Sequence, residues 1–196
     1  FIKQRISFIA WAIAGVSLLL AVITWGNMRD WDFTGLFDTT YAIFPVLGLI
    51  AFSLMWGHYI VWVLREYSGA DEASTKLYTK VTEVIVLLAI FLHPGLMIWQ
   101  LYQDGFGLPP NSYVDAYGEE LAPYLFLGTI SFVISEKKIW KVILGANHIA
   151  MGLIVLHALQ LGTHVQSGWF RSVFLLYAVT LLLSYIYLGA KKKLLG

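Results

Sequence analysis

The chain has 196 residues, of which 59% are hydrophobic and only 13% charged, and its formal net charge is +1. A soluble domain of this length carries about twice that share of charge, so we expect an integral membrane protein in contact with lipid. The lack of cysteine excludes disulfides, cysteine-ligated zinc, iron–sulfur clusters and covalently attached c-type haem. The few basic residues flank apolar runs, so nucleic acid is not an expected partner.

Six apolar runs are candidates for crossing a bilayer, which takes about 20 helical residues. We therefore expect an all-α integral membrane protein, a single domain of six transmembrane helices over residues 1–196. No small-residue cleavage site follows the first run, which favours a signal anchor over a cleaved signal peptide. The fourth run is the weakest, because its apolar core is short and contains Pro123. The predicted spans are Ser7–Trp25, Tyr41–Leu64, Val81–Leu101, Tyr117–Ser135, Ile139–Leu161 and Trp169–Leu188.

Lysine and arginine are distributed unevenly between the connections. If the N-terminus is cytoplasmic, only Arg29 and Arg171 of the thirteen basic residues fall on outer segments, and the other eleven fall on inner ones. Cytoplasmic loops of multi-pass proteins carry such an excess. We therefore expect both termini in the cytoplasm. The expected location is a bacterial inner (plasma) membrane. Connection 104–113 is rich in turn residues, so a compact outer cap is expected there.

Two histidines lie deep inside separate apolar runs, His93 in the third and His157 in the fifth. An ionisable side chain at that depth is costly and is a functional candidate by default. Iron on one ring nitrogen and a carbonyl on the other would satisfy both nitrogens of a neutral imidazole. We therefore expect His93 and His157 to be the axial ligands of a b-type haem. From position alone, a hydrogen bond from His93 to a neighbouring helix is an equally open interpretation.

The other histidines have weaker signals. At ~100° per residue, His148 lies about 180° around the helix from His157, so the two cannot face one cofactor. Counted from the predicted span starts, His93 lies ~18 Å deep, His157 ~27 Å and His148 ~14 Å, which leaves His148 open as the partner of His93. His164 shares a face with His157 at the outer boundary, where it either contacts a haem propionate or is an ordinary interfacial residue. For His58 and His148 we favour structural roles.

Four short motifs follow one another along spans two to five. They are Gly48-Leu-Ile-Ala-Phe-Ser-Leu, the stretch from Lys80 to His93-Pro, Lys138-Ile-Trp140, and Leu156-His157-Ala. In these motifs and their order, the chain resembles the ferric-reductase-like transmembrane domain family. That family includes the membrane domains of NADPH oxidases and STEAP-type metalloreductases, and the haem subunit of a bacterial methionine sulfoxide reductase system.

The resemblance implies histidine pairs on spans three and five that stack two b haems across the membrane. His93 and His157 match the outer pair, whereas the inner positions fall near Lys80 and Leu144, which are not histidine. The chain therefore looks like a single-haem member, unless His148 pairs with His58 in a second site. A single outer haem needs an electron donor on the cytoplasmic side. A flavin, a quinol from the quinone pool and a separate cytoplasmic reductase are the candidates.

The resemblance also implies a haem-dependent oxidoreductase that passes electrons to an outer acceptor such as ferric iron, oxygen or a partner protein. Ligation by two histidines leaves no open iron position, which suits electron transport. Two alternatives stay open. One is a small transporter, channel or metal-binding protein that uses the same histidines, although Glu83 is its only intramembrane acid. The other is a helical subunit with a scaffolding role.

Overall fold

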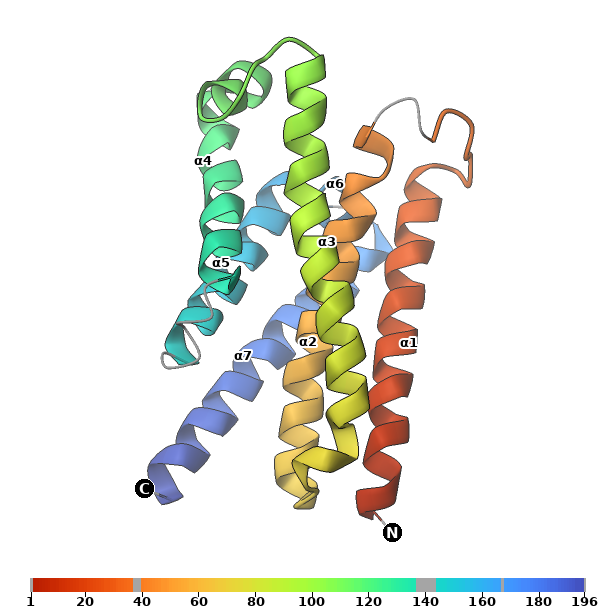
Figure 1. Ribbon diagram of the computed structural model, residues 1–196, viewed down its shortest axis with the longest axis vertical. Helices are drawn as coiled ribbons and strands as arrows, with labels where there is room; N and C mark the ends of the chain where they lie inside the picture. Colours follow the sequence, from red (N-terminus) through yellow and green to blue (C-terminus); the bar gives the residue numbers. More distant parts are fainter. Residues whose placement is uncertain (1, 37–39, 137–143, 167, 196) are drawn as a thin grey trace.

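The computed structural model describes residues 2–36, 40–136, 144–166 and 168–195. Every regular element in these ranges is a helix, as the all-α prediction requires (Figure 1). The long helices are α1 (Ile2–Met28), α2 (Phe44–Ser68), α3 (Lys76–Gln103), α4 (Asn111–Glu136), α5 (Leu144–Leu161) and α7 (Trp169–Leu195). The short ones are η1 (Thr40–Ala42), η2 (Glu72–Thr75) and α6 (Thr163–Gln166).

Four helices in the described part of the chain are long and apolar enough to cross a membrane. They correspond to the first, second, third and sixth predicted spans, and they cover Arg5–Met28, Thr40–Ser68, Glu72–Gln103 and Trp169–Lys191. The protein is therefore a membrane protein by the length and composition of its helices. The side of the membrane on which its termini lie stays a prediction.

The fourth and fifth predicted spans do not reach the same standard, so the count of six crossings also stays a prediction. Helix α4 is broken at Gly118, where φ is 78° and ψ is 166°, and its apolar part begins only beyond that residue. The apolar stretch of α5 that can be described, His148–Leu161, is short. The predicted start at Ile139 lies outside the described residues, and so does the Lys138-Ile-Trp140 motif.

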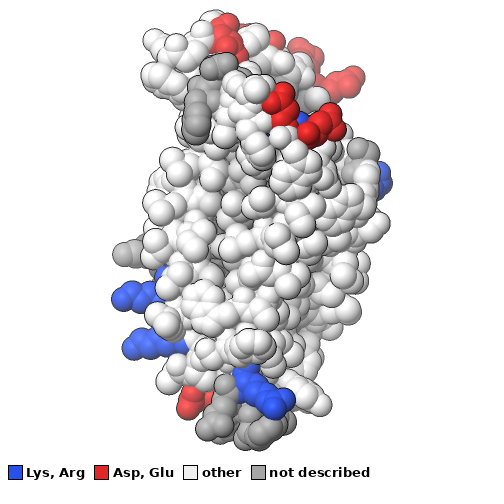
Figure 2. Space-filling view, turned by 90° about the vertical axis from the view of Figure 1, so that its right-hand side faces the viewer, with Lys and Arg blue, Asp and Glu red and all other residues white. Residues whose placement is uncertain are grey.

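The outside of the bundle is apolar over a broad belt. Large hydrophobic side chains are more than half exposed there, among them Phe8, Leu19, Leu88, Leu176 and Leu183. Figure 2 shows acidic residues gathered at one end of the molecule and most lysines and arginines towards the other, with the uncharged belt between them. Such a belt has the character of a surface whose solvent is lipid.

Helix α2 is the centre of the bundle and packs against α1, α3 and α7. Beyond Ile6, the buried face of α1 consists mainly of small residues, among them Ala10, Ala14, Ser17, Ala21 and Thr24. Small residues at this spacing let two membrane helices approach closely. Helices α4 and α5 form an antiparallel hairpin beside this bundle, and in Figure 1 α5 begins well above the lower ends of α2 and α3. Both marked chain ends lie at the lower end of that view.

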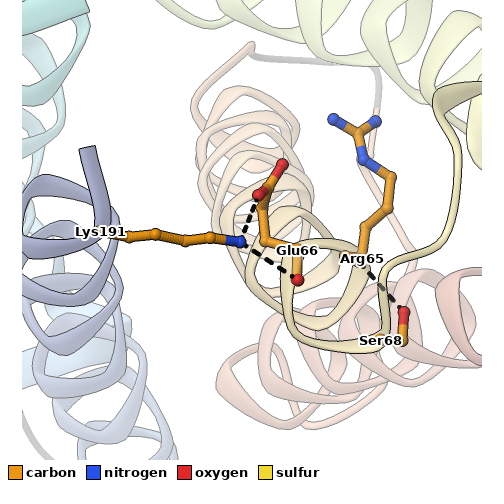
Figure 3. A network of polar contacts seen from close by, with 4 residues as sticks. All are labelled: Arg65, Glu66, Ser68 and Lys191. Carbon is orange, nitrogen blue, oxygen red and sulfur yellow. Dashed lines mark hydrogen bonds and ion pairs between the residues drawn. The ribbon is translucent and has the colours of Figure 1, made fainter. Parts of the chain in front are cut away.

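One ion pair ties the lower end of α7 to α2. The Nζ of Lys191 lies 2.7 Å from Oε2 of Glu66 and also donates to the Glu66 carbonyl at 3.3 Å (Figure 3). The guanidinium of Arg65 points away from this pair in the same view. Both charged side chains are about one-third exposed, 34% and 36%.

We expect Glu66→Gln to lower the melting temperature in detergent by no more than about 2 °C, because an exposed ion pair is screened and must order two long side chains. Thermal unfolding followed by circular dichroism measures this, with Lys191→Met as the matched variant. A fall of ten degrees or more would show that the α2–α7 contact depends on the pair.

Candidate functional site between α3 and α5

The imidazole of His93 is oriented by the beginning of α2. Its Nδ1 lies 2.7 Å from the carbonyl oxygen of Phe44. One turn further along α2 is Gly48, where an added Cβ would lie 2.9 Å from Cε1 of the His93 ring. A side chain at this position would lean towards the N-terminal turn and cover the Phe44 carbonyl. The glycine therefore uncovers the carbonyl and makes room for the ring that binds it.

The same arrangement holds His157, which α5 presents to α4. Its Nδ1 lies 2.9 Å from the carbonyl oxygen of Tyr124. Four residues after Tyr124 comes Gly128, where an added Cβ would lie 2.8 Å from Nδ1 of His157. Helices α2 and α4 thus bind an imidazole from a neighbouring helix in the same way. Each has a backbone carbonyl that accepts the hydrogen bond and, four residues later, a glycine that leaves space for the ring.

The imidazole rings of His93 and His157 lie next to each other. The ring centres of His93 and His157 lie 6.3 Å apart, and the ring planes are at 88° to each other. The depth mismatch expected from the sequence is therefore wrong. It assumed that the fifth span starts at the inner surface, whereas α5 begins higher than the lower ends of its neighbours (Figure 1).

The hydrogen-bond partners determine which nitrogen of each ring carries the proton. A carbonyl oxygen can only accept, so Nδ1 of His93 and Nδ1 of His157 each carry the proton. In a neutral imidazole, Nε2 then holds the lone pair. Neither Nε2 has a hydrogen-bond partner in the part of the chain that the structure describes. Each ring therefore keeps its metal-binding nitrogen available, as a histidine ligand with an oriented outer partner does.

Both histidines line one cavity of about 350 Å³, which we call the upper cavity. Its other walls are mostly apolar and come from α2, α3, α4, α5, α6 and α7. The volume lies within the range of cofactor and small-molecule pockets, which are apolar and carry a few converging polar groups. In the upper cavity, the converging groups are imidazoles.

The residues present fit a haem iron bound from two sides. An imidazole–metal bond is about 2 Å long and the ring centre lies roughly 1 Å beyond the nitrogen, so two ligands on one ion place their ring centres about 6 Å apart. The observed 6.3 Å agrees with that separation. The donors are two neutral imidazoles in an apolar pocket, which is the donor set of a bis-histidine b haem.

His164, on α6, also lines the upper cavity. Its Nδ1 lies 3.2 Å from the hydroxyl of Thr163. Burial lowers the pKa of His164, so its imidazole is neutral at pH 7. Whether His164 contacts a haem propionate or is an ordinary interfacial residue stays a prediction.

His148 and His58 lie elsewhere. Both line a second cavity of about 460 Å³ nearer the lower end, which we call the lower cavity. The ring of His148 packs against Tyr185, with centres 4.1 Å apart, and its Nδ1 lies 3.4 Å from the Tyr59 hydroxyl. The Nε2 of His58 lies 2.5 Å from Oγ1 of Thr82. His93 thus has His157 beside it, and His148 faces the other cavity.

Sequence reasoning identified the two histidines that meet but missed what seats them. Gly128 and the carbonyls of Phe44 and Tyr124 gave no recognisable motif. Gly48 was noticed only as part of the family resemblance. A glycine inside an apolar helix was the one available signal, since it often marks a close approach of another group.

The comparisons with known proteins found no relative of this chain. No protein-family model matches the chain, and neither does any curated protein or solved structure. The resemblance to the ferric-reductase-like family therefore depends on the motifs quoted above and stays a prediction.

Proposed function

We propose that the chain is a b-type cytochrome of the ferric-reductase-like kind, in which His93 and His157 hold the iron of one haem b in the upper cavity. The observation that carries the proposal is the pair of imidazoles from α3 and α5, 6.3 Å apart, each with its Nδ1 tied to a carbonyl. When bound, haem supplies a one-electron couple at its iron.

The protein groups set the character of that site. The carbonyls of Phe44 and Tyr124 accept the Nδ1 protons, which orients both rings and raises the basicity of Nε2. His93 and His157 would both hold the iron, and a haem held by two histidines would supply electron transfer rather than oxygen binding. The apolar walls keep water away and lower the local dielectric, which tunes the redox potential.

The proposal also covers the membrane, the orientation of the chain in it, and the electron donor and acceptor. The chain crosses a bacterial inner membrane six times with both termini in the cytoplasm, and the upper cavity lies towards the outer side. Electrons arrive from the cytoplasmic side, from a reductase, a flavin or a quinol. They leave to an outer acceptor such as ferric iron, oxygen or a partner protein. The concentration of basic residues towards the end that carries both termini supports this orientation (Figure 2).

The transporter alternative uses the same histidines but lacks a comparable observation. Among the described residues, no three histidine, aspartate or glutamate side chains are placed to hold a metal ion. A haem needs only the two imidazoles, because its porphyrin supplies the other four ligands to the iron.

The visible spectrum of the purified chain tests the proposal. We expect a Soret band and, after reduction, the sharp bands of a low-spin b haem, with one haem per chain by the pyridine haemochrome assay. Protein without a Soret band, even after incubation with haemin, would contradict the proposal and favour the transporter or scaffold alternatives.

A further inference from the structure

The stretch of α2 that binds His93 resembles the stretch of α4 that binds His157. Residues 44–54 read Phe-Pro-Val-Leu-Gly-Leu-Ile-Ala-Phe-Ser-Leu, and residues 124–134 read Tyr-Leu-Phe-Leu-Gly-Thr-Ile-Ser-Phe-Val-Ile. Between the two stretches, a leucine, the glycine, an isoleucine and a phenylalanine are identical, and an aromatic residue begins both. The matching glycines are Gly48 and Gly128, the two that leave space for the imidazoles.

The helices that carry the two histidines also match each other. Helix α3 reads Ile90-Phe-Leu-His93, and α5 reads Ile154-Val-Leu-His157. In Figure 1, α2 and α4 both run downwards, and α3 and α5 both return upwards. Each pair of helices provides one carbonyl, one glycine and one histidine, and both pairs line the upper cavity. The pairs α2–α3 and α4–α5 are therefore two versions of one hairpin.

A second pair of equivalent positions lies in the upper cavity. Ala51 and Ser131 come three residues after the two glycines, and both line the cavity. Both side chains are almost fully buried. The hydroxyl of Ser131 donates to the carbonyl of Gly128 in its own helix at 2.7 Å, so it offers no proton to a ligand. What the two side chains share is their small size.

We propose that Ala51 and Ser131 are specificity-determining residues, which leave the space that a macrocycle needs beside the two imidazoles. These roles rest on the proposed function, because a macrocycle surrounds an ion at right angles to the line between two axial ligands. Here that line crosses between α3 and α5, so the macrocycle would extend along the helices. Three residues correspond to about 4.5 Å along a helix, which a porphyrin ring reaches and a bare metal ion does not. The two small side chains thus favour a tetrapyrrole over a lone ion.

Leucine at either position tests these roles, because its larger side chain fills part of the cavity while both histidines remain. Ala51→Leu and Ser131→Leu should each lower haem per chain by about fivefold or more after incubation with haemin. In the haem-free chain, the same variants should raise the melting temperature by a few degrees, since filling a cavity adds apolar contacts. The exchange Ala51→Ser/Ser131→Ala should keep nearly full haem, because both side chains stay small.

Ala122→Leu is the matched control for structural damage. Ala122 is as buried as Ser131 on the same helix, but it belongs to a core cluster with Leu101 and lies outside the lining of the upper cavity. Leucine there should lower the melting temperature of the haem-free chain, because it overpacks a filled core. Full haem in either cavity variant, or haem loss with the same fall in melting temperature as Ala122→Leu, would overturn the roles of Ala51 and Ser131. A wild-type chain that binds no haem would instead defeat the proposed function, and these roles with it.

Discussion

Alanine at His93 or at His157 is expected to leave a chain that inserts into the membrane but keeps less than about a tenth of the wild-type haem. Each variant removes one of the two imidazoles that would hold the iron, and it leaves the other imidazole with its carbonyl partner alone. Loss of an outer partner alone commonly costs 10–100-fold in metal affinity, so loss of the ligand itself should cost at least as much. Haem per chain after purification measures the effect.

His164→Ala is the matched control, because His164 lines the same cavity without joining the pair. It should keep nearly full haem. Added imidazole should restore part of the Soret band in His93→Ala and His157→Ala, since it can fill the space that the ring leaves. If both alanine variants keep full haem, the ligand assignment is wrong even if the chain is a cytochrome.

The second large effect concerns residues that touch no cofactor. Valine at Gly48 or Gly128 should abolish most haem binding although both histidines remain. Even a single added Cβ would stand 2.9 Å or 2.8 Å from the seated ring, closer than packed atoms tolerate. The ring can escape only by giving up its bond to the carbonyl, which moves Nε2 out of line. Alanine should lower haem content by roughly half, as the smaller step in the same direction.

The chain offers controls on the helices that carry the ligands. Gly95 lies two residues after His93 on α3, and Gly152 lies five before His157 on α5. An added Cβ at either would meet nothing within 4 Å. Alanine there should leave haem content unchanged and favour the helix slightly, by up to about 1 kcal/mol. Equal haem loss in Gly95→Ala and Gly48→Ala would mean that general helix disturbance, not the seat of His93, is responsible.

The apolar runs were enough to predict the parts of the fold that lipid dictates. The predicted span Tyr41–Leu64 corresponds to the membrane-length helix Thr40–Ser68, and Val81–Leu101 lies inside Glu72–Gln103. Run length and hydropathy decide such elements locally. The turn-rich connection 104–113 was also predicted, and α4 begins only at Asn111, with left-handed glycines at 105 and 107.

The fourth span shows where that reasoning ends. Asp115, Glu119 and Glu120 precede the apolar part of α4, and the backbone breaks at Gly118. A hydropathy window averages the polar and apolar residues of such a segment, but it does not detect a break in the helix. The position of the α4–α5 hairpin relative to α3 is a matter of packing between distant segments. For that reason the depth estimate for His157 failed, although the part of the fifth run that the structure describes, Leu144–Leu161, is helical as predicted.

The candidate site, too, has one part that the sequence could predict and another part that it could not. An imidazole without a partner is costly in free energy inside the membrane, and this argument identified His93 and His157 from the sequence alone. Their hydrogen bonds to Phe44 and Tyr124 involve backbone atoms, which every residue has, so no sequence pattern announces them.

The low-temperature electron paramagnetic resonance spectrum of the ferric protein tests most directly whether His93 and His157 bind one iron from opposite sides. Two imidazole ligands make the iron low spin, and ring planes at 88° predict the strongly anisotropic form of that signal, from one haem per chain. A high-spin signal, or a low-spin signal unchanged in the His93→Ala/His157→Ala double variant, would contradict the pairing.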